Sequence, residues 1–246
     1  MAEQQQRKQV AGLTGWVGIG LRQLGIGRLA LTIVLLVGAV LLARYAWKLP
    51  LTIEAERALF DWRQVLTAPK VDQDDRIVMV VYTDETLAAT GKRSPLDRAI
   101  LAKALKRIDG FKPKAIGIDI LIDQPQPEDP TIIAAFQAMN SPTFLAYASA
   151  STAEDKIMLW QQEFLENFQK KIAVGPVRPA SIMIQTDDDN VLRSWPKLQK
   201  GLPDLLPIAL YPRSKAAFEN YDRSIRYRLP AYNERPVFAS IPIDTF

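Results

Sequence analysis

The clearest pattern along the chain lies between residues 76 and 130, where two apolar runs flank a stretch with helical periodicity. Residues 77–82 form a continuous apolar and β-branched run, which is typical of a strand buried on both faces. Residues 96–108 carry apolar side chains every three or four positions, so they predict an amphipathic helix. Residues 114–122 return as a second apolar run. The order strand, helix, strand predicts an α/β fold.

The residues around this helix carry recognisable start and stop signals. Ser94 is a good N-cap, Pro95 suits the first helical position, and Asp97 occupies the place of a capping-box carboxylate. Gly110 follows a basic last turn and is typical of a helix C-cap. The sequence therefore predicts a helix of roughly four turns that begins after Ser94 and ends near Gly110.

Charged residues gather at the ends of the two predicted strands. Two strands joined by one helix should be parallel neighbours with a right-handed crossover. Their carboxyl ends then meet at one edge of the sheet, which is where ligands bind in open α/β folds. The candidate ligand-binding residues at this edge are Asp84, Arg98, Asp119, Asp123 and Asp129. A purely structural alternative is that Arg98 pairs with one of the carboxylates and that Asp129 only caps a helix.

The amino-terminal part of the chain predicts a membrane anchor. Residues 29–43 contain no charge and are rich in Leu, Val and Ile. Arg28 and Arg44 bound this run, and their side chains can reach the lipid interface, where the aromatic residues just beyond the run also belong. We therefore expect an amino-terminal tail over residues 1–27 and a transmembrane helix over residues 28–48.

A cleaved signal peptide is the alternative interpretation of this segment. Cleavage after Ala46 would place Arg44 where a small residue is needed, and the region before the apolar run is too long. A retained anchor is therefore favoured. Basic residues flank both sides of the span almost equally, so charge alone does not orient it.

The rest of the chain predicts an alternation of helices and strands. A helix over residues 51–66 leaves the membrane and ends before Pro69. Further helices are predicted at residues 129–140, 151–171 and 205–211, and further strands at residues 143–148, 172–177, 181–186, 225–229 and 237–241. The predicted fold class is α/β, with a single transmembrane helix followed by a mixed, largely parallel α/β domain over residues 49–246.

The composition excludes several classes of chemistry. The chain has no Cys and no His, which excludes disulfides, thiol nucleophiles, Cys/His zinc sites and the usual general base at neutral pH. We therefore predict no catalytic residue, no metal site and no cofactor. The absence of Cys also suits a compartment outside the cytoplasm.

The net charge of +4 does not indicate a nucleic-acid partner. Residues 1–49 hold six basic residues against Glu3, a balance of +5, which leaves −1 for residues 50–246. The basic excess therefore lies next to the predicted membrane helix, and the main domain has no net attraction for a phosphate backbone.

The acidic run over residues 187–189, followed by Asn190, invites comparison with calcium-binding loops. Its spacing is not that of an EF-hand, and the Glu that closes such a loop is absent. A tight, solvated turn is the favoured interpretation.

Five short motifs lie in order along the chain: ERALFDWR (56–63), RIVMVVYTDETL (76–87), RSPLDR (93–98), KAIGIDILIDQPQPED (114–129) and DDDNVLRSWPKL (187–198). Together they resemble CHASE2, a family of extracytoplasmic sensor domains found in bacterial transmembrane receptors. The chain departs from the family pattern at Arg93 and Ser94, where a tryptophan is usual, and at Asn190, which replaces a glycine. Asn also tolerates the left-handed conformation that such a turn demands.

The resemblance implies a sensor with its amino terminus in the cytoplasm, one pass through the bacterial inner membrane and a periplasmic α/β domain. Any catalytic output, such as a nucleotide cyclase or a kinase, would lie outside this chain. The family's last strand, which normally follows residues 241–246, is absent, so the sequence fits a domain truncated at its C-terminus as well as a short protein. The implied partners are an unknown small-molecule or environmental stimulus, the lipid membrane and a second copy in a homodimer.

Two other functions stay open on the residues alone. A metal-dependent phosphohydrolase could use Asp119 and Asp123 to hold magnesium, but their Asp-x-x-x-Asp spacing differs from the familiar Asp-x-Asp pattern, and no general base is evident. A membrane-anchored scaffold or assembly protein could use the apolar stripe with Trp160 and Phe164 as its interface.

Overall fold

The computed structural model describes residues 25–92, 94–151, 157–219 and 223–246. The chain divides after Thr67 into two compact units, which are described separately. Most of the predicted cytoplasmic tail lies outside the described residues, as do Arg93 and part of the helix predicted over residues 151–171.

The described part of the first unit, residues 25–67, consists of two α-helices joined by a short turn. α2 (Ile26–Tyr45) is apolar over most of its length, and the segment Gly27–Tyr45 has a mean hydropathy of 1.9. η1 (Ala46–Lys48) then leads into α3 (Pro50–Thr67), which confirms the helix predicted to follow the membrane segment. Within the part of the chain that the structure describes, α2 alone is long and apolar enough to cross a membrane.

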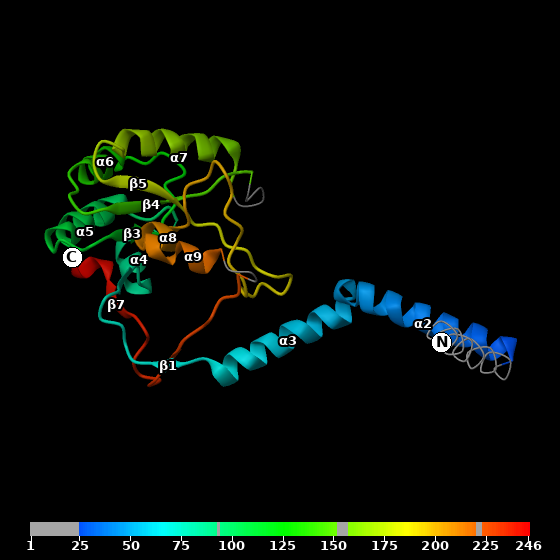
Figure 1. Cartoon of the computed structure of the whole chain (residues 1–246). Helices are drawn as coiled ribbons and strands as arrows, with labels where there is room; N and C mark the ends of the chain where they lie inside the picture. Colours follow the sequence, from blue (N-terminus) through cyan, green and yellow to red (C-terminus); the bar gives the residue numbers. More distant parts are fainter. Residues whose placement is uncertain (1–24, 93, 152–156, 220–222) are drawn as a thin grey trace, which may run out of the picture. The chain divides into compact units, whose positions relative to one another are not determined.

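The second unit is a mixed α/β domain whose strand pairs are parallel (Figure 1). Its central sheet has the order β3-β4-β5, and two smaller sheets pair β1 with β6 and β2 with β7. The strands are β1 (Lys70–Val71), β2 (Val78–Val81), β3 (Ile116–Ile118), β4 (Thr143–Tyr147), β5 (Val177–Ser181), β6 (Leu229–Pro230) and β7 (Ala239–Pro242). The helices are α4 (Asp84–Thr90), α5 (Arg98–Gly110), α6 (Asp129–Gln137), α7 (Leu159–Ile172), α8 (Leu206–Leu210), η2 (Pro212–Ser214), α9 (Lys215–Phe218) and η3 (Ile243–Thr245). The mixed, parallel α/β class predicted from the sequence is confirmed.

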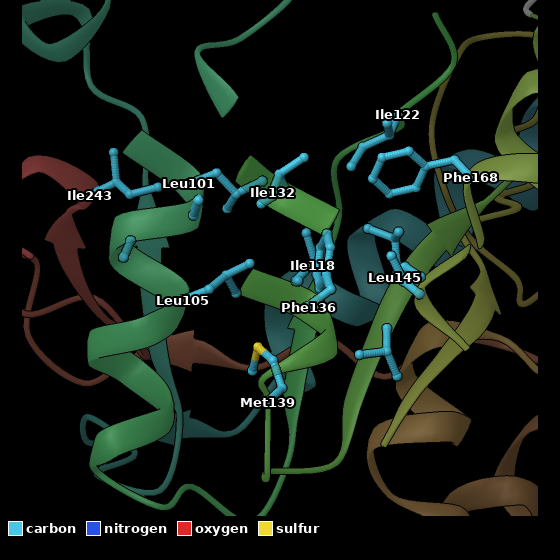
Figure 2. Packing of buried hydrophobic residues seen from close by; sticks show 14 residues of the cluster. Leu101, Leu105, Ile118, Ile122, Ile132, Phe136, Met139, Leu145, Phe168 and Ile243 are labelled. Atoms are coloured by element: carbon cyan, nitrogen blue, oxygen red, sulfur yellow. The ribbon is translucent and has the colours of Figure 1, made fainter. Parts of the chain in front are cut away.

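Helices cover both faces of the central sheet. α6 and α7 lie over one face, α5 packs beside α6, and α8 lies against the other face (Figure 1). A Cβ atom at Gly117 of β3 would lie only 2.8 Å from Leu210 Cδ1, so the absence of a side chain there lets α8 approach the sheet closely. The first core, shown in Figure 2, joins α5, α6 and α7 to the sheet, and both Phe136 and Leu145 are fully buried in it.

The expected pairing of the two central strands is wrong. β2 pairs with β7 from the far end of the chain, with Val78 opposite Ala239, whereas β3 pairs with β4. Apolar periodicity identifies a strand but not its partner, because any parallel neighbour satisfies the backbone groups equally well. β2 is also less buried than predicted, since Val78 and Met79 are about half exposed.

The predicted ends of the central helix are also wrong. The N-cap of α5 is Asp97, whose carboxylate accepts hydrogen bonds from the backbone N–H groups of Ala99 and Ile100. A carboxylate accepts two amide hydrogen bonds and also complements the positive end of the helix dipole, so Asp97 replaces Ser94 in this role. Gly110 is the last helical residue instead of the cap.

The boundaries of several predicted strands also differ from those in the structure. The apolar run over residues 172–177 is divided, because Ile172 continues the buried stripe of α7 after Phe168, and the strand begins only at Val177. β5 then ends at Ser181, where a second strand over residues 181–186 was expected. The strands predicted at residues 114–122, 225–229 and 237–241 are shorter or displaced, as β3, β6 and β7.

Candidate functional site

The site is organised around Arg98, the first residue of α5, which is only 4% exposed. Its guanidinium forms an ion pair with the carboxylate of Asp129 and donates a hydrogen bond of 2.7 Å to the backbone carbonyl of Gln124. The other carboxylate oxygen of Asp129 accepts a hydrogen bond of 3.2 Å from the backbone N–H of Gln126. Because Asp129 begins α6, these contacts join the starts of two helices and hold the loop after β3 between them.

A second set of ion pairs joins the N-cap residues of α5 and α6, Asp97 and Glu128. The Lys92 ammonium lies 3.3 Å from Asp97 Oδ2 and also pairs with Glu128. The hydrogen bond from Lys92 lowers the pKa of Glu128, and the bond to Glu128 raises the pKa of Lys92. Burial acts to raise the pKa of Asp97, but the N–H groups of Ile100 and Ala99 and the Lys92 ammonium outweigh it, so the pKa is lowered.

A cavity of about 330 Å³ lies beside this charge network. It is bounded by Tyr82 after β2, by residues 94–98 at the start of α5, and by the segment 119–124 after β3. The Tyr82 hydroxyl donates a hydrogen bond of 3.0 Å to the backbone carbonyl of Asp97, and burial raises the pKa of this phenol. Tyr82 is therefore neutral at physiological pH and acts as a hydrogen-bond donor at the cavity wall.

The structure places four of the five predicted site residues in or beside this cavity. Asp119 and Asp123 line it; Asp119 is exposed, whereas Asp123 is half-buried and accepts a hydrogen bond of 2.6 Å from the Gln161 side chain. Arg98 also lines the cavity, and Asp129 contacts it through Arg98. Asp84 is instead an exposed residue in the first turn of α4 and is not among the residues that line the cavity.

The expected structural pairing of Arg98 with a carboxylate is present, and its partner is Asp129. Asp129 is not only a helix cap, because Glu128 holds the N-cap position of α6 and Asp129 is the first helical residue. Sequence reasoning did not anticipate Lys92, Tyr82, Glu128 or Gln161. Tyr82 could have been found from its position at the carboxyl end of a predicted strand, where site residues gather. Lys92 and Gln161 lie in segments with no such signal.

The acidic turn is built around Arg193, which is 9% exposed. The Arg193 guanidinium lies 2.7 Å from a carboxylate oxygen of Asp187 and 2.7 Å from one of Asp189. Asn190 has a φ of 62°, the left-handed conformation expected at this position. The run of acids thus forms a tight turn, as the sequence predicted, and the buried guanidinium of Arg193 stabilises it.

The structure gives no specific support to the phosphohydrolase alternative or to the scaffold alternative. Among the residues that the structure describes, no group of three or more acidic side chains is arranged to hold a metal ion, so Asp119 and Asp123 have no third ligand of this kind. In the stripe of α7, Phe164 packs against the core of its own domain, and Trp160 is half-exposed at 52%.

A comparison with known protein families gives one match, which covers almost the whole chain. The model of the CHASE2 domain matches residues 31–243. The chain belongs to the CHASE2 family. CHASE2 domains are extracytoplasmic sensor domains of signalling receptors, and they are sensory domains, not catalytic ones. Neither the curated proteins nor the solved structures contain a match to the chain.

The first prediction concerns the buried ion pair of this CHASE2 domain. Asp129→Ala leaves the Arg98 guanidinium buried without its counter-charge, which should lower the free energy of unfolding by about 3 kcal/mol. Urea denaturation of the full chain in detergent, followed by tryptophan fluorescence, measures the loss. Arg76→Ala is the matched control, because Arg76 pairs with Asp74 at 2.6 Å on the surface with 84% of its side chain exposed. Equal losses in the two variants would contradict a structural role for the buried pair.

The second prediction concerns pH. Because the pKa of Asp97 is lowered below its ordinary value of 3.8, the carboxylate stabilises the folded state above that value, and this stabilisation is lost as the pH falls through the folded-state pKa. Asp97→Asn keeps a good N-cap but removes the charge. Wild type should therefore be more stable than the variant near neutral pH, and the difference should shrink in acid. A difference in unfolding free energy that stays constant from about pH 6 to about pH 2 would contradict this account.

Proposed function

We propose that this chain is the membrane-anchored sensor region of a bacterial signalling receptor. Membership of the CHASE2 family is the observation that carries the proposal. α2 supplies the transmembrane anchor, since 20 helical residues at 1.5 Å each match the hydrocarbon thickness of about 30 Å. The domain over residues 68–246 then lies outside the cytoplasm, and the tail before α2 lies inside.

The cavity beside α5 is the proposed site for the stimulus. Asp119 and Asp123 present carboxylates to it, and Tyr82 contributes an aromatic wall with a neutral hydroxyl. Carboxylates accept hydrogen bonds, so the cavity favours a ligand that presents N–H or O–H groups. Arg98 and Asp129 hold the loop in place, because both side chains are already engaged with each other. Asp84 stays a predicted contact from α4.

Ligand binding at this cavity could directly affect the first residues of α5 and α6. A ligand shifts a conformational equilibrium only as far as it binds one state better than another. The loop after β3 contacts the first residue of α5 and the first residue of α6 through Arg98 and Asp129. A ligand that moves this loop therefore changes how two helices begin. In the receptor that we propose, such a change is relayed through the membrane to an output module.

Ligand binding predicts a gain in thermal stability that depends on Asp119. Purified full chain is screened against metal ions, small acids, sugars and nucleotides, and a ligand at about a hundred times its Kd should add about 2.7 kcal/mol of stability. Asp119→Asn should remove most of the gain without unfolding the chain, because Asp119 is exposed. Asp75→Asn, at an exposed position not among the cavity-lining residues, should keep the gain. Equal gains in both variants would exclude this cavity as the site.

The orientation in the membrane predicts a labelling pattern. Because the chain contains no Cys, one engineered thiol reports on a single position. Lys170→Cys, at an exposed position of α7, should react with a membrane-impermeant maleimide in intact spheroplasts. Gln5→Cys in the tail should react only after lysis. The reverse pattern would contradict an extracytoplasmic domain.

A further inference from the structure

α3 carries a row of apolar side chains that face solvent. Leu51, Trp62 and Val65 have exposed fractions of 77%, 71% and 71%, and no residue of the helix is buried. A contiguous apolar surface of this kind marks a place that another molecule covers. The row, called the α3 stripe here, consists of Leu51, Ala55, Ala58, Trp62 and Val65, with Leu59 and Leu66 along its flank.

The spacing of the α3 stripe is that of a helix that packs lengthwise on another helix. Its positions advance by four, three, four and three residues. This assigns Ala55 and Trp62 to the a positions of a heptad, and Leu51, Ala58 and Val65 to its d positions. The two alanines permit a close approach of two backbones, while the larger side chains fill the space above and below them.

The charges of α3 favour a protein partner over a lipid surface. The helix carries Glu54, Glu56 and Asp61 against Arg57 and Arg63, a net charge of −1. Helices that lie on anionic membranes have a polar face rich in Lys and Arg, which α3 lacks. The five charged residues also separate α3 from the apolar α2, so that it does not extend the membrane span.

The position of α3 directly after the proposed anchor favours a second copy of this chain, in parallel orientation, as the partner. α3 begins five residues after α2 ends, so copies held in one bilayer start their helices at the same height and in the same direction. Identical stripes are then in register along their whole length. With 18 residues, α3 spans about 27 Å, which is too short for a stable coiled coil in free solution. Confinement to a membrane supplies the effective concentration that so short a pair needs.

We propose that α3 packs against α3 of a second copy as a parallel two-helix coiled coil through the α3 stripe. The proposal rests on the membrane anchor of the proposed function and goes beyond sensing, because α3 contributes no residue to the cavity lining and its pairing requires no ligand. It places a helix pair between the membrane anchors and the sensor domains. A change in the domain that moves α3 would alter this pair and so reach the membrane.

Disulfide cross-linking of single-cysteine variants tests the proposal directly. The full chain, which has no native Cys, is reconstituted in vesicles at a high lipid-to-protein ratio and mildly oxidised. A disulfide needs two Cα atoms about 5.5 Å apart, which only facing a or d positions reach. Ala55→Cys, Ala58→Cys and Val65→Cys should cross-link several-fold more than Ile53→Cys, Phe60→Cys and Gln64→Cys on the opposite face. Equal cross-linking on both faces, or none on the stripe because lipid or the chain's own domain covers it, overturns the proposal.

A charge placed in the stripe provides a second test, in which the position of the thiol stays the same and only the interface changes. Trp62→Glu, added to the Ala58→Cys chain, should reduce the cross-linked dimer several-fold, because two carboxylates would face each other in the pair. Gln64→Glu adds the same charge on the opposite face and should leave the dimer unchanged. An equal loss in both double variants would show that the effect is a general one of charge, and would overturn the assigned interface.

Discussion

A buried cation is the constraint on which the sensor domain depends. Arg98 is nearly inaccessible to water at the start of α5, and an uncompensated guanidinium there would cost several kcal/mol. The fold supplies a carboxylate from the first residue of α6 and a carbonyl from the loop after β3. Because these two partners come from segments separate from α5, satisfying one charge brings two helix starts and one loop together.

This arrangement leaves other carboxylates available at the cavity. Asp129 is committed to Arg98, and Asp97 is committed to the backbone of α5 and to Lys92. Asp119 by contrast is exposed at the cavity wall. The committed acids make a rigid frame, and the exposed acid faces a space large enough for a small molecule. In the proposed site, such a frame would hold the cavity wall in a defined geometry before a ligand binds.

The two units of the chain use apolar surface in different ways. The domain over residues 68–246 buries apolar side chains in cores of its own, as Phe136 and Leu145 show. The helices before it keep their apolar side chains exposed, on all sides of α2 and along one stripe of α3. A helix that is apolar on all sides is suited to contact with lipid, whereas a helix with one apolar stripe is suited to packing against another helix. The difference in pattern supports the proposed roles of α2 as a membrane anchor and of α3 as an interface.

The sequence by itself predicted the longer helices, the approximate places of several strands and the family, but it missed α4 and α9 and predicted a strand over residues 181–186 that does not form. The stripe of α5, the apolar length of α2 and the turn at Asn190 can all be predicted along the chain, because each depends on the residues of one short segment. The tertiary structure alone decided the partners. It pairs β2 with β7 and joins Lys92 to Glu128, contacts between segments far apart in sequence. It also moved the N-cap from Ser94 to Asp97. Strand partners, ion pairs and caps depend on which groups the packing of the whole domain brings close together, and the local periodicity of the sequence does not contain this information.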